Sequence, residues 1–133
     1  MRAVVVAVLL LAAALPSAVG ASAQRGFAFG RTGGNIIPFT VSIENNGRVH
    51  VSGPVAVVRK RLTRLEVADL NRVVATNGFE RLRPMNECPD VLPDVAATFV
   101  RVGPLRVQVH GSCLARFQHV YNALVHAVRL KQS

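Results

Sequence analysis

The chain has 133 residues, with 16 lysines and arginines, 7 acidic residues and a formal net charge of +9. This length suits one domain with one hydrophobic core and excludes a long multidomain arrangement. The positive charge favours anionic partners, such as an acidic protein or an anionic polymer, although excess charge also keeps a secreted protein soluble. No basic run exceeds Arg59-Lys60-Arg61, so a dedicated nucleic-acid surface is not expected.

The first 23 residues have the features of a secretory signal peptide. Arg2 precedes an apolar run, Ala3 to Leu15, and Ala21-Ser22-Ala23 supplies small residues before a cleavage site. The run is shorter than the roughly 20 residues that a spanning helix needs, so no membrane span is expected. We predict cleavage near Ala23, one secreted domain over residues 24–133, and location outside the cell or in its envelope. The predicted mature chain keeps 15 basic and 7 acidic residues, a charge of +8.

Phenylalanines alternate with small residues at the start of the mature chain, which predicts a short strand at Phe27 and Phe29. A flexible loop is expected from Gly30 to Asn35. Its glycines and Arg31 suit either a backbone nest for an anion or a plain turn. The phosphate-loop and dinucleotide-binding glycine patterns are both absent.

Residues 38–53, PFTVSIENNGRVHVSG, alternate as a β-hairpin does. A three-residue loop at Asn45 to Gly47, with Gly47 left-handed, pairs Ile43 with Val49 and keeps one face apolar. A two-residue loop would pair Ile43 with His50 and mix the faces. We therefore predict the three-residue loop.

A helix is predicted from Arg64 to Thr76. The residues Thr63-Arg64-Leu65-Glu66 form a capping box, and Asn77-Gly78 is a stop signal. The residues expected on its buried face are Leu65, Ala68, Leu70, Val73 and Val74. The segment from Arg83 to Pro93 contains three prolines and is expected to be an irregular loop.

A second hairpin is predicted from Ala97–Val102 and Leu105–His110, with Val102 opposite Leu105. Because Pro104 is awkward as a second turn residue, its loop is expected to be looser than two residues. A closing amphipathic helix is expected from Cys113 to about Leu130.

Two cysteines, Cys88 and Cys113, lie in the mature part, and an exported chain with this content most simply forms one disulfide. The closed loop of about 25 residues is worth roughly 3 kcal/mol in the chain-entropy model. Without a CxxC spacing, neither a zinc site nor a redox motif is expected.

The order of elements predicts an α+β single domain, with an antiparallel sheet of four or five strands and two helices packed on one face. The open face of such a sheet, together with the glycine loop, is the candidate interaction surface. Its residues are Arg31, Thr32, Gly33, Gly34, Asn35, Arg48, His50, Phe99, Arg101, Arg106 and His110. A plain solvated face explains the same alternation equally well.

The histidines allow an enzymatic alternative, in which His50 and His110 meet on the open face as acid and base of a small secreted nuclease. His119 and His126 are seven residues apart on a helix, about 10 Å along its axis, which is too far for one metal ion. No metal, cofactor or catalytic residue is expected in the leading interpretation.

Four places in the chain form a recognisable layout. They are Arg31-Thr32-Gly33-Gly34 after the first strand, the helix that ends Asn77-Gly78-Phe79-Glu80-Arg81-Leu82, Pro93-Asp94 before the strand Thr98–Val102, and the closing amphipathic helix. This layout resembles that of emfourin-type protein inhibitors of thermolysin-like metalloproteases. The resemblance implies a small antiparallel α+β domain with two helices, and inhibition of a secreted protease. This chain differs by its export signal, its cysteine pair and its positive charge.

The sequence therefore predicts a secreted, small, basic binding protein, protease-inhibitor-like and without catalysis. Its expected partner is a secreted protease or another acidic protein. The alternatives are the nuclease and an envelope module that binds an anionic polymer.

Overall fold

The computed structural model describes residues 25–131, and the predicted signal peptide lies outside this range. The described chain contains eight strands, two α-helices and one short 3-10 helix. In chain order these are β1 (Phe27–Thr32), β2 (Phe39–Ile43), β3 (Val49–Ser52), β4 (Ala56–Val57), α1 (Arg64–Thr76), η1 (Phe79–Arg81), β5 (Met85–Glu87), β6 (Ala97–Val102), β7 (Leu105–His110), α2 (Ala115–Val128) and β8 (Leu130–Lys131).

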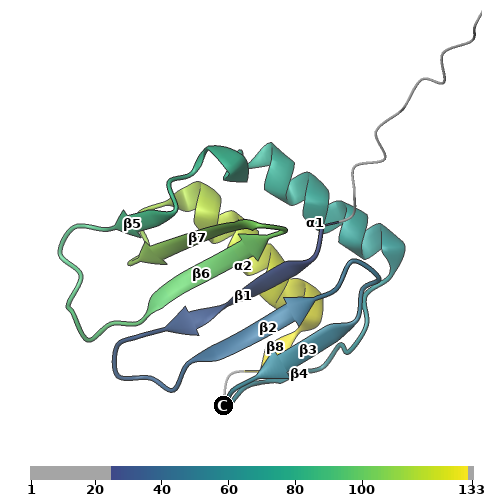
Figure 1. Cartoon of the computed structure of the whole chain (residues 1–133), viewed down its shortest axis with the longest axis horizontal. Coiled ribbons are helices and arrows are strands. Elements are labelled where there is room, and N and C mark those ends of the chain that lie inside the picture. Colours follow the sequence, from purple (N-terminus) through teal and green to yellow (C-terminus); the bar gives the residue numbers. More distant parts are fainter. Residues whose placement is uncertain (1–24, 132–133) are drawn as a thin grey trace, which may run out of the picture.

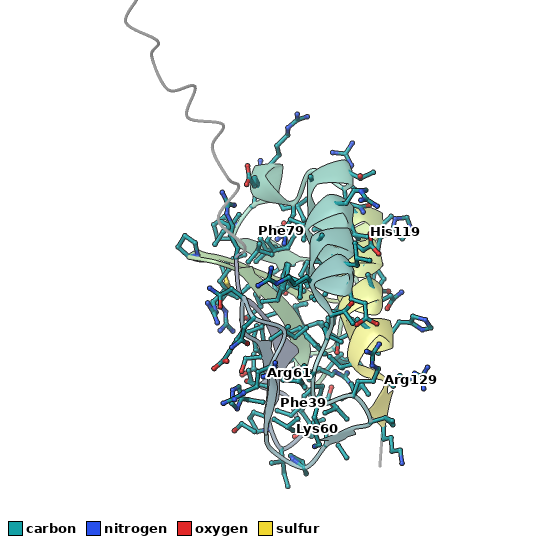
Figure 2. All side chains as sticks on the ribbon, turned by 90° about the vertical axis from the view of Figure 1, so that its right-hand side faces the viewer. Phe39, Lys60, Arg61, Phe79, His119 and Arg129 are labelled. Carbon is teal, nitrogen blue, oxygen red and sulfur yellow. A yellow bond between two sulfur atoms is a disulfide. The ribbon has the colours of Figure 1, made fainter. Side chains whose placement is uncertain are left out.

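Six strands form the main sheet in the order β3-β2-β1-β6-β7-β5, and β4 pairs with β8 in a small second sheet. Neighbouring strands are antiparallel except β5 and β7, which are parallel. Figure 1 shows both helices behind the sheet, and Figure 2 shows the sheet and the helices as two layers. The predicted α+β class is confirmed. The sheet has more strands than expected and is mixed rather than wholly antiparallel.

The central strand β1 supplies the middle of the core. Phe27 lies between Ile43 of β2 and Val102 of β6, and its side chain is completely buried. Phe29 follows on the same face, where the ring of Tyr121 from α2 meets it edge-on at 5.7 Å between centroids. The same burial raises the pKa of the Tyr121 hydroxyl. The apolar face of the sheet is thus closed by α2.

The register predicted for the β2–β3 hairpin is confirmed. Ile43 pairs with Val49, and Val41 pairs with Val51. Gly47 has a φ of +89°, as the three-residue loop requires. An added Cβ at Gly47 would lie 2.1 Å from the carbonyl oxygen of Leu62. This glycine therefore allows both the turn and the close approach of the segment that leads into α1.

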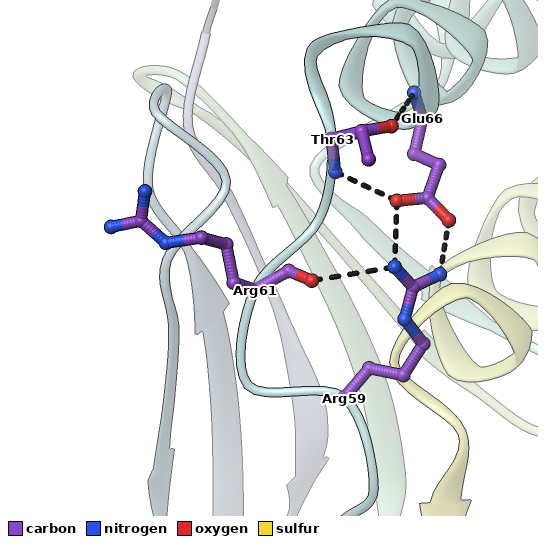
Figure 3. A network of polar contacts seen from close by, with 4 residues as sticks. All are labelled: Arg59, Arg61, Thr63 and Glu66. Atoms are coloured by element: carbon purple, nitrogen blue, oxygen red, sulfur yellow. Dashed lines mark hydrogen bonds and ion pairs between the residues drawn. The ribbon is translucent and has the colours of Figure 1, made fainter.

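Helix α1 has the predicted bounds, and its capping box is present. The amide of Glu66 donates to Thr63 Oγ1 at 3.2 Å, and the amide of Thr63 donates to Glu66 Oε2 at 2.7 Å. Figure 3 shows that the guanidinium of Arg59 also donates to both oxygens of the Glu66 carboxylate. The Arg59 and Thr63 hydrogen bonds stabilise the ionised form and lower the pKa of Glu66 to about 2.

The buried face of α1 differs from the predicted one. Val67, Leu70 and Val74 face the core, whereas Leu65 is 78% exposed and Ala68 is also exposed. Each residue turns a helix by about 100°, so position 65 lies roughly opposite position 67. The helix therefore turns Val67 toward the core and Leu65 toward solvent.

The segment from Arg83 to Pro93 is not wholly irregular as expected, because β5 forms within it. The amide of Gln108 donates to the carbonyl of Pro84 at 2.8 Å, and β5 runs parallel to β7. The outer edge of β7 would otherwise present unpaired backbone groups. Tertiary pairing therefore overrides the proline-rich composition of this segment.

The second hairpin has the predicted register, with Val102 opposite Leu105. The expectation of a looser loop is wrong. Gly103 takes a φ of +56°, so it occupies the left-handed position of a two-residue turn. Pro104 then needs only its ordinary negative φ, as the second central residue of a type II′ turn does.

Helix α2 lies within the predicted span and is slightly shorter. It buries Phe117, Val120, Leu124 and Val128. The predicted disulfide between Cys88 and Cys113 is present, with 5.6 Å between the Cα atoms. It joins the segment after β5 to the chain just before α2.

We predict that Gly47→Ala destabilises the domain more than Gly33→Ala does. Both glycines have positive φ, at +89° and +71°, so both substitutions carry backbone strain. Only Gly47 faces a backbone oxygen, whereas an added Cβ at Gly33 meets nothing within 4 Å. We expect the free energy of unfolding to fall by about 2–3 kcal/mol in Gly47→Ala and by about 1 kcal/mol in Gly33→Ala. Urea unfolding checks this, and equal losses would contradict it.

Candidate functional site

Two loops meet at one end of the main sheet. The β1–β2 loop covers residues 33–38, and the loop between β5 and β6 covers residues 88–96. Figure 1 shows both at the same end of the sheet. The amide of Asn35 donates to the carbonyl of Asp94 at 3.0 Å. Gly34 lies so close to the second loop that an added Cβ would be 2.4 Å from the Asp94 oxygen. We call this pair of loops the loop end.

The loop end carries most of the exposed large apolar side chains among residues 25–131. Ile37 is 71% exposed and Leu92 is 66% exposed, and Ile36 and Val95, on the same two loops, are 37% and 39% exposed. Single exposed apolar residues are ordinary, whereas several on adjoining loops make the loop end a candidate contact surface.

A shallow cavity of about 350 Å³ lies beside the first loop. Ile36, Ile37 and Phe39 form one side, and Val55 and Leu130 form much of the rest. Arg31 also lines it, because odd-numbered residues of β1 face the helix layer. The predicted site residue Arg31 therefore lies beneath the loop end and not on the open face of the sheet.

The second loop is held at both ends. The disulfide fixes Cys88 to Cys113, and Gly111 packs so tightly that an added Cβ would lie 2.5 Å from the Cβ of Cys88. Near the other end, His110 Nε2 lies 2.7 Å from the carbonyl oxygen of Val95. These contacts hold the loop in one conformation before any partner arrives.

His110 makes two polar contacts that together require the protonated ring. Nδ1 lies 2.8 Å from Glu87 Oε2, and Nε2 lies 2.7 Å from the Val95 carbonyl. A carboxylate and a carbonyl only accept hydrogen bonds, so both ring nitrogens must donate. The contact with Glu87 raises the pKa of His110, the Val95 carbonyl adds to this, and burial opposes it. The His110 ring thus links β5, β7 and the second loop.

The predicted glycine loop begins later than expected. Strand β1 continues through Thr32, so only Gly33, Gly34 and Asn35 belong to the loop. The loop remains part of the candidate surface because the exposed residues Ile36 and Ile37 directly follow it. The interpretation as an anion nest stays a prediction.

The open face of the sheet carries other predicted residues but differs at Phe99. That side chain was expected on an exposed surface, yet it is 5% exposed. The guanidinium of Arg106 lies 4.1 Å from the centre of its ring and covers it. Arg101 donates to the carbonyl of Gly103 at 2.9 Å. At the centre of the open face, the arginine side chains are therefore already in contact with other groups of the sheet.

The structure does not bring His50 and His110 together. They lie on β3 and β7, which are four strand positions apart in the sheet. At about 4.8 Å between neighbouring strands, the separation is on the order of 19 Å. His50 instead contacts Glu44 at 3.1 Å. Acid–base catalysis needs both groups within hydrogen-bond reach of one substrate, so this pair has no shared reaction centre.

Ile36, Ile37, Leu92 and Val95 were not singled out from the sequence. Two adjacent isoleucines before Pro38, and Leu92 beside Pro93, are apolar residues in segments too short or too proline-rich for regular structure. The sequence could have indicated them as apolar residues within predicted loops. It could not show that the two loops meet, because this depends on β1 and β6 being neighbours in the sheet.

Among residues 25–131, no group of three or more histidine, cysteine or acidic side chains is placed to hold a metal ion. Within the same range, none of the helices is long and apolar enough to cross a membrane. Comparisons with protein-family models, with curated proteins and with solved structures found no match.

We predict that His110 makes stability depend on pH. Its folded pKa is raised, so its stabilising effect is complete below the ordinary histidine value of about 6.5 and is lost as pH rises through the folded value. Urea unfolding at pH values below and above about 6.5 measures the free energy of unfolding, and an NMR titration of the imidazole measures the pKa of His110. Glu87→Gln should lower the pKa of His110. A pKa at or below about 6.5 in the native protein would contradict the contact geometry.

Proposed function

We propose that the protein is a secreted binding domain that docks onto a partner protein through the loop end, in the manner of a protease inhibitor. The observation that carries this proposal is a group of exposed apolar side chains on two loops that are already fixed. Ile37 and Leu92 present their side chains to solvent, while Asn35, Cys88 and His110 hold the backbone beneath them.

Fixed loops favour binding because little conformational entropy is lost when the partner arrives. Each side chain that must be ordered in a complex costs about 0.5–1.5 kcal/mol. The hydrogen bond from Asn35 to Asp94 and the disulfide restrict the backbone of the two loops already in the folded protein, so less ordering remains for the binding step. An apolar protrusion of this kind suits a partner that offers an apolar pocket, as a protease does at its substrate cleft.

The resemblance to inhibitors of thermolysin-like metalloproteases suggests the first partner to test. Its matching residues Gly33 and Gly34 begin the first loop, and Pro93 and Asp94 lie in the second. Two of the four matching places therefore contribute residues to the loop end, and the other two lie at the end of α1 and in α2. The basic charge of the predicted mature chain also suits an acidic partner.

The test is a titration of a thermolysin-type protease with the purified mature chain. We expect inhibition by the native sequence and a loss of at least about tenfold in affinity for Ile37→Asp and for Leu92→Asp, because a charge would enter an apolar interface. Leu65→Asp is the matched control, since Leu65 is an exposed leucine on α1. It should leave inhibition unchanged.

Failure to inhibit at micromolar excess would contradict the inhibitor version. A capture experiment from the medium and envelope of the secreting cells then tests docking itself, using the native chain, Ile37→Asp and Leu65→Asp as baits. A partner retained by the native chain and by Leu65→Asp, but lost with Ile37→Asp, is the expected result. Equal recovery with all three baits would refute docking through the loop end.

A further inference from the structure

Two arginines face each other at the end of the sheet opposite the loop end. Arg48 and Arg61 form an antiparallel backbone bridge. The amide of Val49 donates to the carbonyl of Lys60 at 2.9 Å, and the amide of Leu62 donates to the carbonyl of Gly47 at 2.8 Å. These bonds flank the pair, so 48 and 61 form a non-hydrogen-bonded pair. Such pairs have Cα atoms about 4.5 Å apart and side chains on the same side of the strands.

No carboxylate neutralises this pair within residues 25–131. The carboxylates on the adjoining segments are engaged elsewhere, because Glu44 contacts His50 at 3.1 Å and Glu66 is held by Arg59 and Thr63. Figure 3 shows the side chain of Arg61 pointing away from the Arg59–Glu66 contact. Like charges directly opposite each other on neighbouring strands repel. The native fold therefore keeps an unfavourable contact that a bound anion would relieve.

Further positive charge lies along the same segment. Lys60 and Arg64 flank Arg61 in the chain, and the side chains of Arg48, Lys60, Arg61 and Arg64 are all exposed. Arg64 occupies the first turn of α1, where the helix dipole disfavours a cation. The capping box already occupies the end of this helix, so the candidate site consists of the side chains alone. We call these four residues the arginine-pair patch.

We propose that the arginine-pair patch binds phosphate groups repeated along an anionic polymer of the cell envelope. Paired guanidinium groups suit phosphate oxygens, to which each donates parallel charge-assisted hydrogen bonds. Lys60 and Arg64 add exposed positive charge on either side of Arg61 in the chain, so a ligand with repeated anionic groups suits this segment better than a single anion does. A single acidic side chain of a protein would neutralise one arginine and leave the others unsatisfied.

This surface is separate from the loop end. Strand β1 spans the sheet between them, and five residue steps of about 3.3 Å give a separation on the order of 17 Å. A partner at Ile37 and a polymer at Arg48 therefore do not compete for the same residues. The proposal does not depend on protease inhibition, and it would retain the protein near the surface from which it is secreted.

The experiment compares two double variants of the mature chain that lose the same charge. Arg48→Gln with Arg61→Gln removes the pair, and Arg83→Gln with Arg116→Gln removes two exposed arginines elsewhere. The probe is fluorescently labelled long-chain polyphosphate, measured by anisotropy over a series of salt concentrations. We expect the pair variant to lose at least about tenfold in affinity and the control less than about threefold. The slope of log K against log salt should fall by about 1.4 in the pair variant.

Competition with unlabelled polymers distinguishes the ligand chemistry. Polyphosphate should displace the probe more effectively than poly-glutamate of matched charge, and at least as effectively as single-stranded DNA. Stronger competition by poly-glutamate would overturn phosphate recognition, and stronger competition by DNA would overturn the assignment to an envelope polymer. Equal losses in the two double variants would show that only net charge matters, and no loss in either would show that the pair does not contribute to binding. Either result would overturn the site.

Thermal unfolding supplies a second measurement. At low salt the pair variant should unfold at a temperature no lower than the native chain, because a repulsive contact is removed. Polyphosphate should raise the unfolding temperature of the native chain and of the control more than that of the pair variant. If the double variant fails to fold, the single variant Arg61→Gln takes its place in both assays, with Arg83→Gln as its control.

Discussion

The burial of β1 between β2 and β6 is the constraint on which the rest of the structure depends. Phe27 and Phe29 lie on its helix side and are completely buried, so the strand cannot move without opening the core. On its other side, opposite these phenylalanines, the strand has the small residues Ala28 and Gly30. An added Cβ at Gly30 would lie 2.0 Å from the carbonyl oxygen of Phe39 and 3.0 Å from the ring of Phe99. The absence of a side chain at Gly30 therefore lets the backbone of Phe39 and the ring of Phe99 lie close to β1.

The position of β1 also decides which loops meet. Since β1 and β6 are antiparallel neighbours, the loop that leaves β1 and the loop that enters β6 lie at the same end. The β2–β3 turn then falls at the opposite end, beside the segment that enters α1. One strand thus separates an apolar loop end from a basic patch. The two proposed contacts, one with a protein and one with a polymer, follow from this separation.

Different interactions hold the two surfaces. At the loop end, the disulfide and the contacts of His110 hold residues 88–96 against β7. At the other end, Gly47 lets the carbonyl of Leu62 approach the turn, which places Arg61 opposite Arg48. The first arrangement includes a non-glycine residue with positive φ, Asp90 at +61°, and the second brings like charges together.

Local signals were enough to predict much of the fold. The period of two in residues 38–53, the left-handed glycine in its turn and the capping box before α1 act over a few residues, and each was confirmed. The two cysteines of a chain predicted to be exported likewise indicated the disulfide. Pairing within a hairpin is predictable because side-chain alternation allows only one register that keeps the apolar face together.

The candidate sites were predicted only in part. The glycines of the first loop and Arg48 were named, but Ile37 and Leu92 were not, and Phe99 was placed on an exposed face although Arg106 covers it. The alternation along a strand predicts which face of the sheet a side chain lies on. It does not predict whether a side chain from a neighbouring strand covers it. The burial of Phe99 depends on the cross-strand position of Arg106, which no single strand reveals.

The sequence by itself determined β1, the two hairpins, the bounds of α1, the disulfide and the basic charge, because each depends on residues close in the chain or on composition. Only the tertiary structure decided the strand order, the parallel pairing of β5, the separation of His50 from His110 and the meeting of Arg48 with Arg61. These features join residues that are distant in the chain. They are selected by the packing of one shared core, and pairwise contacts of that kind leave no periodic trace in a single sequence.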